Sequence, residues 1–288
     1  MTEPVRTIKV RGLSLAFRDN ESRGHPVVFL HGSSLSMEVF SRQFESELLR
    51  NHRLIALDLP GHGASDNAVD ASQTYSLRGF AATIQAFLEA RGIARATLVG
   101  WSLGAHVALE LMATTDIAAG VVITGAPPIA LGPFGLLRGF CAHWDVLLTS
   151  KENFTDRDES RFLALCFGHE EQPPFRAALH RADGRVRPNF VRSILRGEGA
   201  DEARAVEVSG VPVAVVNGAD EPVARLGYVA GLAYGNLWRG QCHIIPDAGH
   251  SPFWQKPYLY NGLLHDFVED VIRSEAAARE VHAAGSTA

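Results

Sequence analysis

The chain has 288 residues, of which 46% are hydrophobic and 20% are charged, so it can bury a substantial core as one domain or as a domain with an insertion. Its net charge of −5 and the lack of a basic run argue against binding to nucleic acid or to an anionic membrane surface. No apolar run has the length that spans a bilayer, and the first residues lack the apolar region of a secretory signal. The three irregularly spaced cysteines are typical of free thiols in a reducing cytosol. We therefore expect a cytoplasmic protein, either a monomer or a homodimer.

Short apolar runs alternate with segments of helical periodicity along most of the chain. Strands are expected at residues 7–10, 13–17, 26–30, 53–58, 96–100, 120–125, 211–216 and 243–245. Helices are expected at residues 37–49, 75–91, 103–112, 258–272 and within 222–232. The alternation predicts an α/β fold, with a mostly parallel eight-stranded sheet and helices on both of its faces.

The alternation pauses between residues 126 and 208, where charged and aromatic residues become frequent and prolines interrupt the pattern. We interpret residues 127–208 as a helical cap that is inserted into a core formed by residues 1–126 and 209–273. Residues 274–288 are rich in alanine and end in Gly-Ser-Thr-Ala, so we expect a flexible, frayed tail there.

A candidate nucleophile lies where the fifth expected strand meets a helix. The sequence Gly100-Trp101-Ser102-Leu103-Gly104 has the G-x-S-x-G pattern of a nucleophile elbow, a turn so sharp that its serine adopts strained backbone angles. A Cβ atom at either glycine would crowd the point where the strand and the helix nearly touch. The pattern alone is common, but its place between a strand and a helix makes Ser102 the candidate nucleophile.

A serine hydroxyl becomes a good nucleophile only when a neighbouring base removes its proton. His250 is the candidate base, because it follows the last expected strand and the adjacent Gly249 frees the backbone to turn. The base needs a carboxylate to orient it, and Asp220 and Glu221 both follow the preceding strand, in the chain order nucleophile, acid, histidine. We favour Glu221 as the acid, with Asp220 capping the turn or the next helix, and keep Asp220 as the alternative acid.

Attack on a carbonyl group creates an oxyanion, and each N–H donor already aimed at it can contribute about 3 kcal/mol. We expect these donors to be the backbone N–H groups of Leu103 and of Ser33, which follows the third strand. Asp58 and His62 are expected to tie a loop beneath the site. Candidate residues for binding the substrate are Gly32, Trp101, Phe134, Phe140, Trp144, Phe162 and Pro222, although cap packing alone would account for most of the aromatic ones.

The sequence contains neither the H-x-H-x-D-H cluster of zinc-dependent lactonases nor a G-x-G-x-x-G dinucleotide motif. We therefore expect no metal and no organic cofactor. The expected partner is a small-molecule acyl lactone or ester, with no nucleic acid and no membrane.

The motifs together resemble the α/β-hydrolase fold superfamily, from about residue 5 to residue 273. The segments that carry this resemblance are His31-Gly32-Ser33-Ser34, Asp58-Leu59-Pro60-Gly61-His62-Gly63-Ala64-Ser65, Gly100-Trp101-Ser102-Leu103-Gly104, Gly218-Ala219-Asp220-Glu221-Pro222 and Ala248-Gly249-His250-Ser251-Pro252-Phe253. This fold hosts many reactions, so the superfamily alone does not give the substrate.

Other segments resemble the N-acyl-homoserine lactonases built on this fold, in which a glutamate followed by proline is the triad acid. They are Thr124-Gly125-Ala126-Pro127-Pro128, Asp183-Gly184-Arg185, Val215-Val216-Asn217-Gly218-Ala219-Asp220-Glu221-Pro222 and Tyr234-Gly235-Asn236-Leu237-Trp238. The chain departs from that family at Ser33, where the family tends to carry asparagine, and at Phe162, where it tends to carry a cap tyrosine.

This second resemblance implies a serine hydrolase that opens a lactone or ester through an acyl-serine, with N-acyl-homoserine lactone hydrolysis, known as quorum quenching, as the leading activity. A general carboxylesterase or a carbon–carbon bond hydrolase of the same fold is the alternative. A non-catalytic ligand receptor is a third hypothesis, less favoured because the nucleophile, acid and base are all present.

Overall fold

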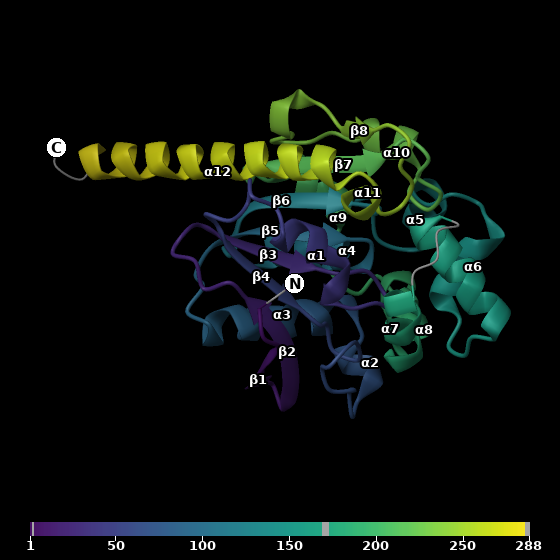
Figure 1. The fold of residues 1–288 in the computed structure, drawn as a ribbon. Coiled ribbons are helices and arrows are strands. Elements are labelled where there is room, and N and C mark those ends of the chain that lie inside the picture. Colours follow the sequence, from purple (N-terminus) through teal and green to yellow (C-terminus); the bar gives the residue numbers. More distant parts are fainter. Residues whose placement is uncertain (2, 169–172, 286–288) are drawn as a thin grey trace.

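The computed structural model describes residues 1, 3–168 and 173–285 and is built on one eight-stranded sheet (Figure 1). The sheet order is β1-β2-β4-β3-β5-β6-β7-β8. Strand β2 pairs antiparallel with both of its neighbours, β1 and β4, and all other neighbouring strands pair parallel. The predicted mostly parallel sheet of eight strands is therefore confirmed. The strands are β1 (Arg6–Val10), β2 (Leu13–Asp19), β3 (Pro26–Leu30), β4 (Arg53–Leu57), β5 (Ala96–Trp101), β6 (Ala118–Thr124), β7 (Val213–Gly218) and β8 (His243–Ile245).

Helices flank both faces of this sheet and fill the long connection between β6 and β7 (Figure 1). The α-helices of the first half are α1 (Ser41–Phe44), α2 (Ala71–Thr74), α3 (Leu77–Ala90) and α4 (Leu103–Thr114). Those of the second half are α5 (Pro133–Gly139), α6 (Asp156–Phe167), α7 (Pro173–Arg181), α8 (Val186–Leu195), α9 (Glu202–Val208), α10 (Leu226–Ala230), α11 (Pro252–Gln255) and α12 (Pro257–Gly285). Three short 3-10 helices complete the described chain: η1 (Met37–Phe40), η2 (Trp144–Ser150) and η3 (Trp238–Gly240).

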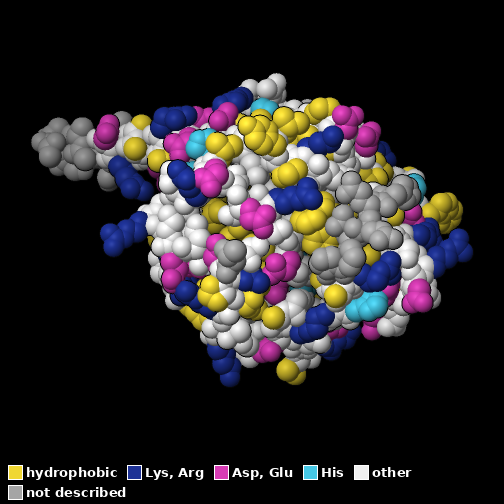
Figure 2. Space-filling model, in the orientation of Figure 1, with side chains coloured by type: hydrophobic (Ala, Val, Ile, Leu, Met, Phe, Trp, Pro, Cys, Tyr) yellow, Lys and Arg dark blue, Asp and Glu magenta, His cyan; other side chains and the backbone are white. Residues whose placement is uncertain are grey.

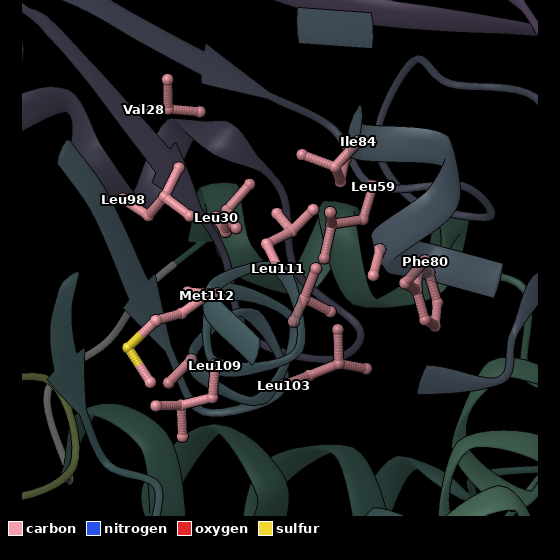
Figure 3. Packing of buried hydrophobic residues seen from close by; sticks show 14 of the residues in the cluster. Val28, Leu30, Leu59, Phe80, Ile84, Leu98, Leu103, Leu109, Leu111 and Met112 are labelled. Carbon is pink, nitrogen blue, oxygen red and sulfur yellow. The ribbon is translucent and has the colours of Figure 1, made fainter. Parts of the chain in front are cut away.

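Both faces of the sheet are buried, which explains why its parallel strands are continuous apolar runs. Successive residues of a strand point to opposite faces, so in β3 the side chains of Val28 and Leu30 join one hydrophobic cluster while Val27 and Phe29 join the other. The first cluster lies against α3 and α4, as Figure 3 shows. The second lies against η1, α11 and α12.

Helix α12 is longer than predicted. It continues to Gly285 and projects beyond the sheet (Figure 1), whereas the sequence suggested a helix at 258–272 followed by a frayed tail. The predicted helix end at residue 272 is therefore wrong, because alanine is the strongest helix former and neither glycine nor proline occurs between residues 263 and 284. The flexibility of the tail stays a prediction. Residues 286–288 lie outside the described part of the chain.

Another helix is shorter than predicted: the segment expected to be one helix at 37–49 forms only η1 and α1, after which single turns lead to β4. The helix expected within 222–232 is confirmed as α10. It begins at Leu226, because the Glu221 carboxylate accepts the backbone N–H groups of Val223 and Ala224 and holds them in a turn.

The connection between β6 and β7 contains helices but no strand in residues 125–168 and 173–212. Its residue Phe140 forms an isolated bridge with Ala224, which follows β7. This helical composition agrees with the predicted cap, whose boundaries at 127 and 208 remain a prediction. None of the helices described in the chain is both long and apolar enough to cross a bilayer. On the face shown in Figure 2, acidic and basic side chains are interspersed.

Replacing Leu98, a fully buried residue of β5, tests the packing of the first cluster. We expect Leu98→Ala to lower the free energy of unfolding by about 2–5 kcal/mol, because it removes buried methyl groups and leaves a cavity. The matched control is Val69→Ala, since Val69 is 97% exposed and should change stability by less than about 0.5 kcal/mol. Urea denaturation measures both, and equal stabilities of the two variants would contradict the packing.

Candidate active site

The turn at Ser102 has the geometry that its sequence predicts. Ser102 follows β5, begins α4 and has a φ angle of 52°, a left-handed value that is unusual for a residue other than glycine. A Cβ atom on Gly100 would lie 2.4 Å from the Cα atom of Ala105, and one on Gly104 would lie 2.0 Å from the carbonyl oxygen of Leu30. The crowding predicted for both glycines is thus confirmed, and it forces the strained turn that exposes the serine.

His250 and Glu221 are brought together from the loops after β8 and β7. The Nδ1 atom of His250 lies 2.8 Å and 3.0 Å from the two carboxylate oxygens of Glu221, and both residues are buried. Burial by itself raises the pKa of Glu221, but the charge and hydrogen bond of His250 and the N–H groups of Val223 and Ala224 outweigh it, so the pKa is lowered. The side chain is therefore held as a carboxylate.

Asp220 takes a different position from its neighbour. It is exposed, its backbone N–H donates to the carbonyl of Ala248, and it lines an outer cleft. The expectation that its side chain caps the turn or the next helix is wrong: Glu221 accepts the turn's N–H groups, and Arg225 stands at the N-cap of α10. Of the two candidate acids, Glu221 is the one in contact with His250.

The imidazole of His250 is fixed from several sides. Its backbone carbonyl accepts a hydrogen bond from Trp101 Nε1 at 2.8 Å. Gly125 lies so close that a Cβ atom there would be 2.6 Å from the ring carbon Cε1. The backbone N–H of Gly125 donates to Asn217 Oδ1 at 2.8 Å. Asn217 was not singled out by sequence reasoning, although its place at the end of a buried strand was a usable signal.

Two backbone N–H groups are free to face a ligand near Ser102. Leu103 opens α4, and the first residues of a helix have no preceding carbonyl in the helix to bind. No hydrogen bond within the described residues engages the N–H of Ser33. Ser33, Ser102 and Leu103 line the same cavity, so the structure brings the expected donors to the candidate nucleophile.

Two buried histidines hold the loop that carries Ser33. His62 Nε2 accepts the backbone N–H of Ser34 at 2.9 Å, and His31 Nε2 accepts that of Leu59 at 3.0 Å. Each ring can accept through Nε2 only while that nitrogen carries no proton. Burial lowers the pKa of His31 to about 4 and lowers that of His62 well below its ordinary value.

Asp58 supports the same loop from below. Its carboxylate accepts the backbone N–H groups of Met37 and Ala64, each at 2.8 Å. Burial raises the pKa of Asp58 to about 6, although these two hydrogen bonds act in the opposite direction. The prediction that Asp58 and His62 tie a loop beneath the site is confirmed.

Three hollows lie at the candidate site, and Ser102 lines two of them. A narrow space is lined by Gly32, Ser33, Trp101, Ser102, Phe162 and His250, among others. It borders a cavity of about 240 Å³, whose walls are mostly apolar and include Leu136, Phe140, Val146, Phe190 and Ile194. On the other side, Pro222 and His250 face the outer cleft.

Two candidate substrate-binding residues are misplaced. Phe134 is 77% exposed and Trp144 is 79% exposed, and neither lines one of these hollows. Their prediction as pocket residues is wrong, because an aromatic side chain on a short amphipathic cap helix can face outward as easily as inward. The five other candidates, Gly32, Trp101, Phe140, Phe162 and Pro222, do line a hollow.

Arg187 is a pocket residue that sequence reasoning missed. Its guanidinium is buried, lines the apolar cavity, stacks on Phe154 at 3.9 Å and donates to Ser34 Oγ at 2.6 Å. Burial lowers its pKa to about 10. Arg187 thereby joins α8 to the loop beside the candidate nucleophile.

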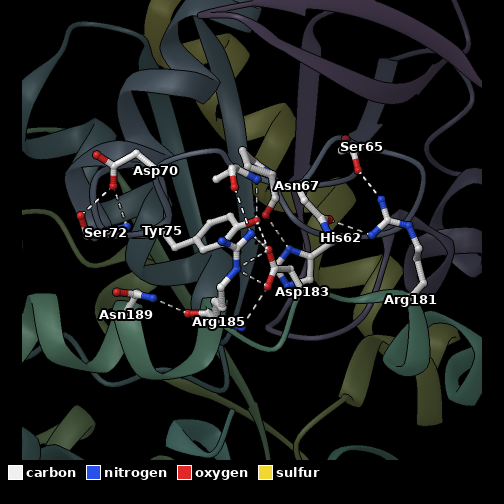
Figure 4. A network of polar contacts seen from close by, with 12 residues as sticks. His62, Ser65, Asn67, Asp70, Ser72, Tyr75, Arg181, Asp183, Arg185 and Asn189 are labelled. Atoms are coloured by element: carbon white, nitrogen blue, oxygen red, sulfur yellow. Dashed lines mark hydrogen bonds and ion pairs between the residues drawn. The ribbon is translucent and has the colours of Figure 1, made fainter. Parts of the chain in front are cut away.

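A polar network joins residues 181–185, in the segment predicted as the cap, to residues 65–75, in the predicted core (Figure 4). The Asp183 carboxylate accepts a hydrogen bond from Tyr75 Oη at 2.8 Å and pairs with Arg185, whose guanidinium also reaches the carbonyl of Ala68 at 3.0 Å. Nearby, Arg181 donates to the carbonyl of Ser65 at 2.7 Å. The Asp183-Gly184-Arg185 segment thus binds the predicted cap to the predicted core and lines none of the three hollows.

Comparison with known proteins gives the family. A family model described as the alpha/beta hydrolase family matches residues 27–261. The chain belongs to the alpha/beta hydrolase family.

This alpha/beta hydrolase is similar in structure to a lactonase. A crystal structure of a mutant of the N-acyl homoserine lactonase AidH, complexed with N-hexanoyl homoserine lactone, has a TM-score of 0.90 and 34% sequence identity, covering 94% of this chain and 99% of that one. The predicted resemblance to the lactonases of this fold is confirmed.

Curated relatives of this alpha/beta hydrolase have other names. A pimeloyl-[acyl-carrier protein] methyl ester esterase of Methylococcus capsulatus is 31% identical over 270 residues, covering 88% of this chain and 98% of the esterase. A 2-hydroxy-6-oxononadienedioate/2-hydroxy-6-oxononatrienedioate hydrolase of Pseudomonas putida is 25% identical over 283 residues, covering 89% of this chain and 92% of that protein. Membership of the family therefore leaves the substrate open.

The buried histidines predict how stability depends on pH. Because the folded state lowers the pKa of His31 to about 4, the unfolded chain binds a proton between about pH 6.5 and 4 that the folded chain refuses. The free energy of unfolding should therefore fall as the pH drops through this window, by up to about 1.4 kcal/mol per pH unit for each such group.

The measurement is urea denaturation between pH 6.5 and 4.5. We expect His31→Asn to show a shallower pH slope than the wild type, while the exposed His180 provides the control His180→Asn with an unchanged slope. Identical slopes in the wild type and His31→Asn would show that the ring at position 31 is charged in the folded state.

Proposed function

We propose that the protein hydrolyses an acyl lactone or ester through an acyl-serine intermediate, with an N-acyl-homoserine lactone as the substrate. The observation that carries the proposal is the contact of His250 Nδ1 with the buried Glu221 carboxylate, while His250 and Ser102 line one narrow space. This arrangement supplies a nucleophile, a base and an acid that fixes the base. The 34% identity with AidH supports the choice of a lactone.

In the proposed reaction, His250 removes the hydroxyl proton as Ser102 Oγ attacks the carbonyl carbon, with Nε2 as the accepting nitrogen because Nδ1 faces Glu221. The carbonyl oxygen becomes an oxyanion, which the N–H groups of Leu103 and Ser33 stabilise. The imidazolium then protonates the leaving alkoxide, the carbon–oxygen bond breaks, and an acyl-serine forms. A water molecule deprotonated by His250 releases the acid. In a lactone the alcohol stays tethered to the acyl group, so water must attack before the ring closes again.

The acyl chain is proposed to occupy the apolar cavity beside Ser102. Its volume of about 240 Å³ and its walls of leucine, valine, isoleucine and phenylalanine suit a hydrocarbon chain, because burial of each CH₂ group contributes about 0.8 kcal/mol. Because the cavity is lined by Ser102 itself, a chain bound there would extend directly from the attacked carbonyl.

Substitution of the two neighbouring acids tests the proposed triad. We expect Ser102→Ala to abolish hydrolysis, and Glu221→Gln to lower kcat by about 10³–10⁴-fold, because an amide donates to Nδ1 and imposes the wrong tautomer on His250. The matched control is Asp220→Asn, which should leave kcat within about twofold, since Asp220 is exposed. If Asp220→Asn were the inactive variant, the assignment of the acid would be wrong.

A substrate panel tests the choice of substrate. The wild type is assayed with N-acyl-homoserine lactones of short and long chain, open alkyl and aryl esters, and a dienoic diketone, with Ser102→Ala as the blank. Preferential opening of the lactones supports the proposal. Turnover of open esters or of the diketone without lactone opening would instead assign the broader esterase or the carbon–carbon hydrolase activity that the curated relatives represent.

Two adjacent leucines of α5 test the acyl cavity. Leu136 lines the cavity, whereas Leu137 is 68% exposed and does not. We expect Leu136→Phe to lower kcat/KM for a long-chain substrate by about tenfold or more relative to a short-chain one, because the added ring takes up space in the pocket. Leu137→Phe should leave this ratio unchanged; a similar loss in both variants would place the acyl chain elsewhere.

A further inference from the structure

A cluster of three potential metal ligands lies outside the candidate active site. His52 stands immediately before β4, while His265 and Glu269 stand four residues apart on α12 and therefore on the same face of that helix. One ligand atom from each residue can be chosen so that all three lie within 4.8 Å of one another. The fold thus brings His52 next to two residues that lie more than two hundred positions later in the sequence.

The histidines of this cluster have unused hydrogen-bonding atoms. The side chain of His52 is only 5% exposed, and its Nε2 atom has no hydrogen-bond partner within the described residues. The Nδ1 atom of His265 is likewise buried without a partner there. A buried polar atom that remains unpaired costs about 1–3 kcal/mol, so such atoms in a native protein call for an explanation.

The distance between two of the ligands fits a shared metal ion. His52 Nε2 lies 3.5 Å from Glu269 Oε1. Two ligands that each lie about 2.0–2.1 Å from a tetrahedral zinc ion are separated by roughly 3.3–3.4 Å. Hence a zinc ion could bind both atoms after a shift of a few tenths of an ångström.

We propose that His52, His265 and Glu269 form a binding site for a divalent transition-metal ion, with Zn²⁺ as the favoured ion and water as its fourth ligand. Two imidazole nitrogens and one carboxylate oxygen form a ligand set that zinc accepts in proteins. Coordination would engage the two unpartnered nitrogens. Since one ligand precedes β4 and two belong to α12, the ion would also fasten this helix to the sheet.

The proposed site is separate from the candidate active site and independent of the proposed function. Ser102 follows the carboxyl end of β5, whereas His52 precedes the amino end of β4, and the two strands run in the same direction in the sheet. The two sites therefore lie at opposite ends of the parallel strands, the candidate active site at their carboxyl ends and the proposed metal site at their amino ends. The ion is expected to stabilise the fold and to take no part in hydrolysis.

Zinc titration of the full, untagged and chelator-treated protein at neutral pH tests the proposal, with a chromophoric zinc indicator as competitor. We expect the wild type to bind one zinc ion per chain, and the double variant His265→Gln/Glu269→Gln to bind it at least about tenfold more weakly. The control is His180→Gln, because His180 is an exposed histidine 2.7 Å from a carboxylate, that of Glu159, and its loss should leave the binding unchanged.

Thermal unfolding gives a second measurement on the same proteins. Zinc should raise the Tm of the wild type and of His180→Gln but not that of the double variant, while similar Tm values without zinc would show that the double variant is folded. The absence of zinc binding in the wild type, or equal binding in the double variant, would overturn the proposal and leave His52 and Glu269 as an ordinary ion pair.

Discussion

The candidate active site depends on a close contact between backbone atoms of β3, β5 and α4. The helix can approach the strands only because positions 100 and 104 carry no side chain, and this approach forces the left-handed backbone of Ser102. The same contact fixes the start of α4, and with it the N–H of Leu103. The candidate nucleophile and one expected oxyanion donor are therefore positioned by packing rather than by flexible side chains.

The loops that surround this elbow are fixed by buried polar groups. His31 and His62 accept backbone N–H groups, Asn217 accepts that of Gly125, and Trp101 donates to the backbone of His250. Buried polar atoms are costly when unpaired, so each loop is held most firmly in the one conformation that pairs them all. The rim of the sheet is thus ordered before a substrate arrives.

Much of the core could be predicted from the sequence, because a strand buried on both faces must be apolar throughout, as at residues 26–30. The pairing of His250 with an acid after β7 could also be predicted, but only the fold shows that Glu221 is the residue in contact. Phe134 and Trp144 were misjudged because a hydrophobic side chain does not reveal which way a short cap helix faces. The helix at 37–49 was overestimated because tertiary contacts, such as those of Gln43 with Phe253 and Asn261, override local periodicity.

The cluster of His52, His265 and Glu269 could not be found by spacing alone, since one member comes from a loop far from α12 in the sequence. The pair four residues apart on one helix was the only local signal, and such pairs are common on exposed helix faces. Only the pairing of β4 within the sheet and the packing of α12 against it bring the third residue to the other two.

The space beside His250 bears on how this chain can diverge from its relatives. A side chain at Gly125 would collide with the imidazole, whereas outward-facing cap positions such as Phe134 meet no such restriction. We therefore expect substitutions to be tolerated more readily at such outward-facing positions than at Gly125, where the backbone must stay next to the ring.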